Sequence, residues 1–170
     1  MTEFQTAMAL AAAVKGGTLS ASAWLAATLA DIETRNPALN CFTAVTAERA
    51  RSQAQGIDEA IAAGQDPGPL AGVPFAVKNL FDIQGLTTIA GAKLNQGNPP
   101  AAQNATVITR LQQAGAVLVG ALNMDEYAYG FVTINAHFGT TPNPHDPTRM
   151  AGGSSGGSAA AAAAGPVPFA

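Results

Sequence analysis

The apolar run AVLVG at residues 116–120 constrains the fold of this chain more than any other stretch. It follows directly on a helical pattern that Gly115 ends. An uninterrupted apolar strand is typical of a sheet that is covered on both faces. A second apolar run, VPFAV at residues 73–77, ends in Lys78. Strands of this kind, alternating with helices, predict an α/β fold, although the pattern does not fix the order of the strands.

Helical spacing and turn signals predict four longer helices, at residues 4–14, from residue 20 to about 34, 46–64 and 104–114. Ser20 can cap the second helix, and Asn36-Pro37 should close it, because the residue before a proline avoids the helical region. Residues 41–45 resemble a short strand. In the fourth helix, the side chains expected to face the core are Val107, Ile108 and Leu111.

The stretch after the central strand gives a capping signal. Asn123 and Glu126 are spaced like an N-cap and its returning carboxylate, which predicts a short helix through Tyr129. Asp125 and Glu126 could instead pair as acid and base, but capping explains Glu126 more simply. Tyr127 and Tyr129 either line a pocket or pack against the fold. Residues 139–147 are predicted to be loop.

Composition excludes several classes of protein. Only 11% of residues are charged, against about 25% in ordinary soluble domains, which indicates faces that further sequence or a partner covers. A net charge of −3 offers no basic surface for nucleic acid. Residues 151–170 are too rich in Gly, Ser and Pro to cross a membrane. The expected partners therefore include neither nucleic acid nor a membrane.

Cysteine usage and the first residues indicate the compartment. Cys41 is the single cysteine, so no intrachain disulfide can form, and a reducing cytoplasm suits the chain. The N-terminus lacks the basic region of a secretory signal and carries Glu3. His137 and His145 have no carboxylate or thiol at ligand spacing and are interpreted as structural or surface residues. We therefore expect a cytoplasmic protein without a metal or other cofactor.

The segment AGGSSGGS at residues 151–158 concentrates hydroxyls and small residues before an alanine run. It lacks the Gly-Lys-Ser/Thr ending of a phosphate-binding P-loop, and it leads into a helix-favouring block rather than a linker. Gly153-x-Ser155-x-Gly157 matches the nucleophile elbow of α/β-hydrolases. However, residues 147–150 make a poor strand before the elbow, and no histidine follows Ser158. The elbow interpretation is therefore disfavoured.

Lys78 has two interpretations that the sequence leaves open. Most lysines lie at the surface, with the stem covering apolar atoms. Alternatively, if Lys78 shares a strand face with Ala76, its ammonium group is partly desolvated. A desolvated lysine can be neutral near pH 7 and can then act as a base.

Four segments in this order resemble the amidase signature family. They read LAGVPFAVKN, GALNMDEYAYG, FGTTPNP and AGGSSGGS, at residues 70–79, 120–130, 138–144 and 151–158. The resemblance extends from the second helix onward, and the combination is highly specific. The details at residues 79–82, 123–130 and 143–146 look most like the carboxybiuret hydrolase branch of s-triazine breakdown. The A-type subunits of glutamyl-tRNA amidotransferase are the similar alternative.

The resemblance implies a mixed sheet flanked by helices and a Ser–cis-Ser–Lys triad that hydrolyses amides. By position, Lys78 is the lysine, and Ser154, preceded by a cis peptide bond, is the bridging serine. Gly130 and the carbonyl group of Ala128 would lie at the substrate pocket. Ser155 loses the elbow role and becomes a hydrogen-bonding neighbour on the substrate side. The implied substrate is a small carboxylated urea or biuret-type amide.

The chain departs from the family in one respect. The serine that becomes acylated lies further downstream in the family, but residues 159–170 contain no Ser, Thr, Cys or Asp. Residues 1–170 are therefore interpreted as the N-terminal part of a single amidase domain, inactive alone. The alternatives are an amidotransferase role with glutamine as nitrogen donor, or a non-catalytic short form that pairs with a full-length subunit. The kind of assembly we expect is a homo-oligomer or a complex with a small accessory subunit.

Overall fold

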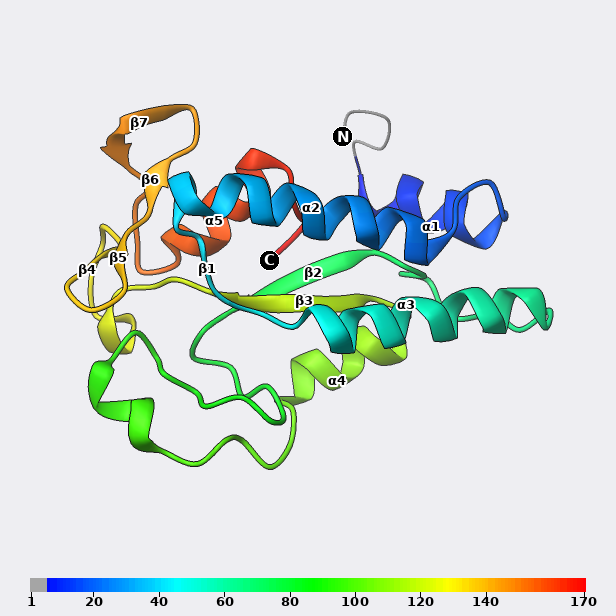
Figure 1. The fold of residues 1–170 in the computed structure, drawn as a ribbon, viewed down its shortest axis with the longest axis horizontal. Helices are drawn as coiled ribbons and strands as arrows, with labels where there is room; N and C mark the ends of the chain where they lie inside the picture. The colour runs from blue at the N-terminus through cyan, green and yellow to red at the C-terminus, as the bar shows by residue number, and fades with distance from the viewer. Residues whose placement is uncertain (1–5) are drawn as a thin grey trace.

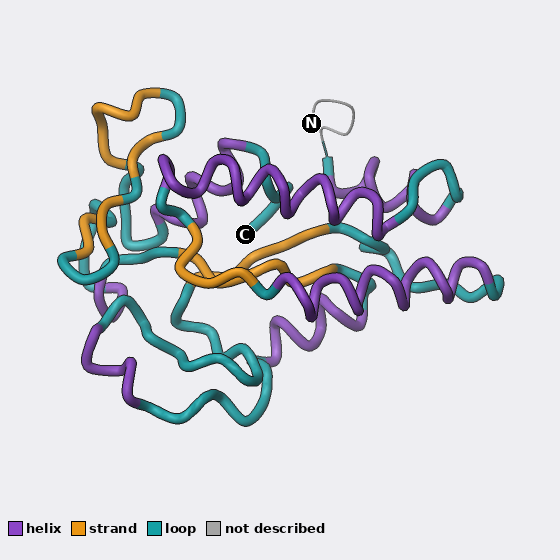
Figure 2. The backbone as a smooth tube through the Cα atoms, viewed as in Figure 1, coloured by secondary structure: helices purple, strands orange, loops and turns teal. Residues whose placement is uncertain are grey.

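The computed structural model of the protein describes residues 6–170, in which helices pack on both faces of a small sheet (Figures 1 and 2). Three strands form this sheet in the order β1 (Phe42–Val45), β3 (Val117–Leu122), β2 (Pro74–Lys78). β1 runs antiparallel to β3 and β2 runs parallel to it, so the sheet is mixed. Every residue of the central strand β3 is buried, as its apolar sequence predicts. The predicted α/β class is confirmed.

Alternate residues of β3 face two separate parts of the core. Val117 and Val119 pack with buried residues of α1 (Ala7–Lys15), α2 (Ala21–Leu39), α3 (Ala47–Ala62) and α5 (Gly156–Ala164). Leu118 packs on the other side with Ile108 of α4 (Thr106–Gln113). In Figure 1, α1, α2 and α5 accordingly lie above the sheet and α4 lies below it. None of the helices within residues 6–170 is long and apolar enough to cross a membrane.

The first helix begins close to its predicted position. Within the described residues α1 starts after Thr6, whose side chain accepts a hydrogen bond from the Ala9 N–H group, and ends at Lys15. Residues 4 and 5 of the predicted helix lie outside the described residues.

The second helix is longer than predicted. Ser20 does cap α2, because its hydroxyl accepts a hydrogen bond from the Ala23 N–H group. The predicted end before Pro37 is wrong, since α2 continues through Pro37 to Leu39. The residue that ends it is Asn40, which takes the left-handed conformation with φ 45°. A proline in the last turn removes one backbone donor there, and Asn40 still donates to the Asn36 carbonyl at 2.7 Å.

α4 lies within the predicted range 104–114, but one of its apolar residues does not face the core. Ile108 is fully buried and Leu111 packs against the same core. Val107 is 42% exposed, so its predicted inward orientation is wrong. It lies beside a cavity next to β2 instead. Between Lys78 and α4 the chain is loop apart from the short 3-10 turn η1 (Lys93–Gly97), as Figure 2 shows.

The predicted helix at residues 123–129 does not form. Asn123 is fully buried, and its amide group donates to the carbonyls of Asn40 and Gly139 and to the Thr141 hydroxyl. The side chain therefore links three segments instead of capping a helix. Only a 3-10 turn, η2 (Glu126–Ala128), follows, and Tyr127 within it has φ 51°. A positive φ at Tyr127 interrupts the helical geometry.

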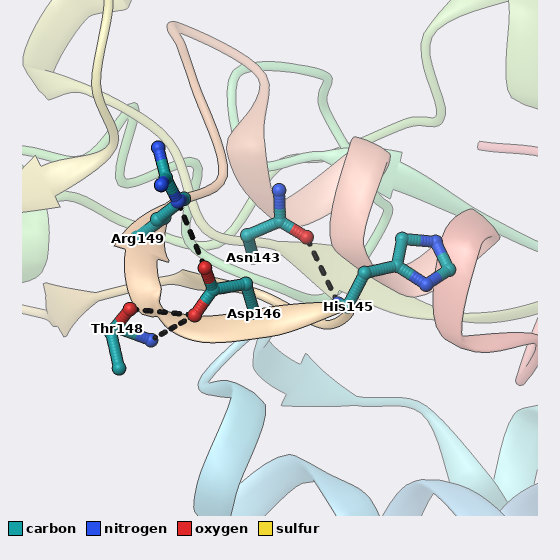
Figure 3. A network of polar contacts seen from close by, with 5 residues as sticks. All are labelled: Asn143, His145, Asp146, Thr148 and Arg149. Atoms are coloured by element: carbon teal, nitrogen blue, oxygen red, sulfur yellow. Dashed lines mark hydrogen bonds and ion pairs between the residues drawn. The ribbon is translucent and has the colours of Figure 1, made fainter.

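Residues 134–150 contain four short strands, and three of them include residues of the segment 139–147 that was predicted to be loop. β4 (Ile134–Asn135) pairs with β5 (Gly139–Thr140), and β6 (Pro142–Asn143) pairs with β7 (Asp146–Met150). Figure 3 shows the β6–β7 hairpin: Asn143 accepts from the His145 N–H group, and Asp146 accepts from Thr148 and Arg149. These local bonds supply the turn chemistry that the loop prediction overlooked.

The chain end lies against the free edge of β2. After α5, Phe169 forms an isolated parallel bridge with Phe75, and the two rings stack with centroids 5.8 Å apart. Phe75 is completely buried. The fold thus brings residues 151–170 against the strand that ends in Lys78 (Figure 1).

Candidate active site

Lys78 and Ser154 meet where β2 ends. Lys78 is the last residue of β2 and is half-buried. Its Nζ atom donates to Ser154 Oγ at 2.7 Å, across 76 positions of sequence. The peptide bond between Gly153 and Ser154 is cis. The structure therefore brings together the two residues that the resemblance assigned to a Ser–cis-Ser–Lys triad.

The surroundings of Lys78 favour its neutral form. Burial lowers the pKa of the Lys78 ammonium group, and the negative charge of Asp125 opposes part of that fall. A cavity of about 540 Å³ opens beside Lys78, and the side chains of its other lining residues are uncharged. They are Phe75, Ala76, Val77, Leu80, Phe81, Val107, Leu111, Ser155, Ser158, Phe169 and Ala170. Of the two interpretations of Lys78, the partly desolvated one therefore matches the structure.

Backbone hydrogen bonds hold the segment that carries Ser154. The Ser154 carbonyl accepts from the Asp125 N–H group at 3.2 Å. Next along the chain, the Gly156 N–H group donates to Thr133 Oγ1 at 2.9 Å, and the Gly157 N–H group donates to the Asn123 carbonyl at 3.1 Å. A Cβ at Gly156 would lie 2.6 Å from the Thr133 Cβ, so only glycine fits this close approach. Residues 154–157 are thus held by the residues that follow β3, namely Asn123 and Asp125, and by Thr133.

The predicted substrate-side residues have different environments. Ser155 is exposed, precedes α5 and lines the cavity with Lys78. Gly130 packs so closely on Asp125 that a Cβ there would lie 2.5 Å from the carboxyl carbon. Ala128 is exposed, with φ 59°. The structure thus places Ser155 on the same cavity as Lys78, and Gly130 against Asp125.

Several other candidates turn out to be peripheral. His137 and His145 are exposed, as predicted for surface residues. Tyr127 and Tyr129 are 56% and 94% exposed, so neither packs in the core formed by residues 6–170. Burial raises the pKa of the Cys41 thiol to about 11, which leaves it protonated at neutral pH. Among residues 6–170, no three His, Cys, Asp or Glu side chains gather closely enough to hold a metal ion.

Asp125 is the residue whose place the sequence reasoning missed. It is only 5% exposed, whereas its supposed acid–base partner Glu126 points to solvent. The Asp125 carboxylate accepts the N–H groups of Val132 and Thr133 at 3.2 and 2.9 Å. The available signal was an acidic residue just after a fully apolar strand, next to a turn that ends in Gly130.

Comparison with known proteins identifies the family. The family model described as amidase matches residues 23–170. The chain belongs to the amidase family. AtzE, the 1-carboxybiuret hydrolase subunit of Pseudomonas sp. strain ADP, is 54% identical over 142 residues, which cover 84% of this chain and 31% of that protein. The A-type subunit of the glutamyl-tRNA(Gln) amidotransferase of Chloroflexus aurantiacus is 46% identical over 171 residues, 99% of this chain and 35% of that protein.

Solved structures give the same result for the fold. A structure from a vestigial protein complex that reveals the evolutionary origins of an s-triazine catabolic enzyme matches with a TM-score of 0.94 and 52% identity. The match covers 95% of this chain and 35% of that one. A bacterial aryl acylamidase of the amidase signature family matches with a TM-score of 0.90 and 33% identity, over 95% of this chain and 34% of that one. The amidase chain thus spans about a third of the length of the relatives it matches.

Proposed function

We propose that this chain carries the Lys78 and cis-Ser154 half of a Ser–cis-Ser–Lys site for amide hydrolysis. The observation that supports it is the 2.7 Å hydrogen bond from a partly desolvated Lys78 to Ser154, which follows the cis peptide bond. An amide is a poor electrophile, so its attacking hydroxyl must lose a proton as the new bond forms. A neutral lysine next to a serine hydroxyl can accept that proton.

The proposed relay conserves protons at each step. Ser154 takes the proton of the nucleophilic serine and passes its own proton to the Lys78 amine. The nucleophile bonds to the amide carbon, the C–N bond breaks, and the proton returns through Ser154 to the leaving nitrogen. Water then attacks the acyl-enzyme with the same two groups as base and relay. Gly130, the Ala128 carbonyl and Ser155 are proposed to contact the substrate.

In this proposal, residues 1–170 do not supply the nucleophilic serine of the triad. Residues 159–170 contain no Ser, Thr or Cys. We therefore propose that residues 1–170 form the N-terminal part of one amidase domain and do not hydrolyse amides by themselves. Hydrolysis by the purified chain above the level of a Lys78→Ala variant would overturn this.

The proposed substrate is a small carboxylated urea or biuret-type amide. What favours it is the 54% identity to AtzE, which is higher than the 46% identity to the Chloroflexus amidotransferase protein. The amidotransferase match extends over 99% of this chain, so glutamine as nitrogen donor is the second candidate. Relatives that are subunits of larger enzymes also support assembly with a small accessory protein or a full-length copy.

A chimera tests the proposal directly. Residues 1–170 replace the matching third of AtzE, and ammonia release is measured separately with 1-carboxybiuret and with glutamine. We expect turnover of 1-carboxybiuret that Lys78→Ala and Ser154→Ala each lower by about 100-fold or more, whereas the exposed control Lys93→Ala leaves it unchanged. A folded chimera that acts only on glutamine would favour the amidotransferase alternative. A folded chimera that acts on neither amide would contradict amide hydrolysis.

A further inference from the structure

Asp125 contacts the Ser154 segment through both its backbone and its side chain. Its N–H group donates to the Ser154 carbonyl at 3.2 Å. Its carboxylate lies against Gly153, where a Cβ would overlap one carboxylate oxygen. Gly130, in the loop that follows η2, packs on the same carboxylate. The absence of side chains at Gly130 and Gly153 thus leaves room for the Asp125 carboxylate. This carboxylate lies directly against Gly153, the residue before Ser154.

The carboxylate is itself held in a fixed place. It accepts the Thr133 N–H group at 2.9 Å and the Val132 N–H group at 3.2 Å, and Asp125 is only 5% exposed. Thr133 is completely buried, and its hydroxyl accepts the Gly156 N–H group at 2.9 Å. Asp125 and Thr133 therefore clamp residues 153–156 from both ends of the turn that carries Ser154.

Asp125 also acts on Lys78 through its charge. Its negative charge favours the ammonium form of Lys78, in opposition to burial. Within residues 6–170, Asp125 is the only charged group that contributes to the shifted pKa of Lys78, and the other side chains that line the cavity are uncharged. Opposed effects of this kind keep a base near the pH at which it works, instead of leaving it permanently neutral.

From these contacts we propose that Asp125 is a positioning residue, which sets the place of Ser154 through the Gly153 peptide and the Ser154 carbonyl and holds a negative charge near Lys78. The proposal rests on the proposed roles of Lys78 and Ser154. Asp125 does not itself touch the reacting atoms. Lengthening it to Glu should fail, because Gly130 and Gly153 leave no space for another methylene.

The test reads Lys78 directly, without turnover. The 170-residue chain is treated with an amine-acylating reagent over a range of pH, and mass spectrometry gives the labelling midpoint of each of its lysines, Lys15, Lys78 and Lys93. Exposed Lys93 is the internal reference. We expect the wild-type Lys78 midpoint to lie below that of Lys93, because only a neutral amine reacts. Equal midpoints in the wild-type chain would overturn the proposal.

In Asp125→Asn, the direction in which the Lys78 labelling midpoint changes shows whether Asp125 acts through its charge or only supports the fold. If Asp125 acts by charge in a preserved site, the Lys78 midpoint falls further while that of Lys93 stays constant. If Asp125 only supports the fold, loss of the fold exposes Lys78, and its midpoint rises to that of Lys93. A folded variant, judged by circular dichroism, with an unchanged Lys78 midpoint would also contradict the proposal.

Gly153→Ala provides a second test of the role of the Asp125 carboxylate if Asp125→Asn does not fold. The added Cβ displaces the carboxylate without changing any titratable group, so the Lys78 midpoint should fall, as in Asp125→Asn, while that of Lys93 stays constant. Gly97→Ala is the matched control, because a Cβ there meets nothing within 4 Å. An unchanged Lys78 midpoint in Gly153→Ala would show that the carboxylate does not set the site. If the AtzE chimera is inactive but the labelling midpoints change as expected, the proposed function is contradicted and the proposed role of Asp125 is still supported.

Discussion

At the scale of single residues, the protonation of Lys78 decides how the proposed site responds to pH. Burial lowers its pKa, and Asp125 only partly restores it. The active form is the neutral amine, so activity of the AtzE chimera should rise with pH and level off below the ordinary lysine pKa of about 10.4. A pH–rate profile of kcat/KM checks this. A rising limb centred at or above the ordinary lysine value would contradict a desolvated base.

Removing the amine should cost the chimera the contribution of a general base. We expect Lys78→Ala to lower kcat by about 100- to 10,000-fold, the usual contribution of a positioned base. Lys78→Arg should fail equally, because a guanidinium group does not give up its proton at working pH. KM should change less than kcat, since the lysine is proposed to act on the nucleophile instead of on the substrate. Substantial activity in the arginine variant would rule out a proton-accepting role.

Asn123 shows how a single buried amide group can link distant segments. It donates to two carbonyls and a hydroxyl, and its own oxygen accepts the Met124 N–H group. Asn123→Ala removes these hydrogen bonds, although the Asn40 carbonyl keeps the Thr141 hydroxyl as a donor, and it should lower the free energy of unfolding by about 2–3 kcal/mol. Urea denaturation followed by circular dichroism measures the change. Asn98→Ala, at an exposed position, is the control and should be neutral.

At the scale of elements, α2 is capped from another helix. Asp58 of α3 accepts the N–H groups of Ala21 and Ser22 and the Ser20 hydroxyl. Burial raises the pKa of Asp58, but the hydrogen bonds from Ser22, Ser20 and Ala21 together outweigh it, so the net pKa is lowered. The two helices are thus joined where α2 begins.

Asp58→Asn should therefore destabilise the fold by about 1 kcal/mol near neutral pH, the usual value of an N-cap. A lowered carboxyl pKa gives stability that is present above the unfolded pKa and is lost as pH falls through the folded pKa. The difference between variant and wild type should therefore shrink in acid. Thermal melts across that range check it, with the exposed Glu33→Gln as control. A constant difference at every pH would contradict the linkage.

Local signals predicted elements well and failed where tertiary contacts take over. The apolar runs at β2 and β3 and the cap at Ser20 were read correctly, because each depends on neighbouring residues. Pro37 was read as a terminator, but α2 continues past it to Asn40. Asn123 was read as a cap, but partners from residues 40, 139 and 141 capture its side chain. No spacing rule within one segment could reveal those partners.

The candidate site divides in the same way. Lys78 and Ser154 came from the resemblance, since 76 positions separate them and no local pattern joins them. Asp125 was missed because its partners at Gly130, Val132 and Gly153 are known only once the turn and the serine segment are folded. Val107 was assigned to the core from the helical spacing of apolar residues alone, but it lines the cavity beside β2.

At the scale of the whole molecule, the chain end covers the strand that carries the lysine. Phe169 stacks on Phe75 and lies along the edge of β2. Phe169→Ala should lower the free energy of unfolding by about 2 kcal/mol, less than the 3–5 kcal/mol of a fully buried phenylalanine, because Phe169 is half-buried. Chemical denaturation gives the value. Leu94→Ala, at a position 84% exposed, should be silent, and equal effects of the two substitutions would argue against the stacking contribution.

The few bonds that hold the serine segment have a consequence for how the molecule opens. Segments held by few hydrogen bonds open more readily than a central strand that is paired on both sides. Residues 151–157 are held by a few bonds to Asp125, Thr133 and Asn123, whereas β3 has a paired strand on each side. The serine segment should therefore detach from an otherwise folded sheet. Amide hydrogen exchange at Gly156 and Gly157 would then outpace that at Val119, and the lysine would spend part of its time without its partner.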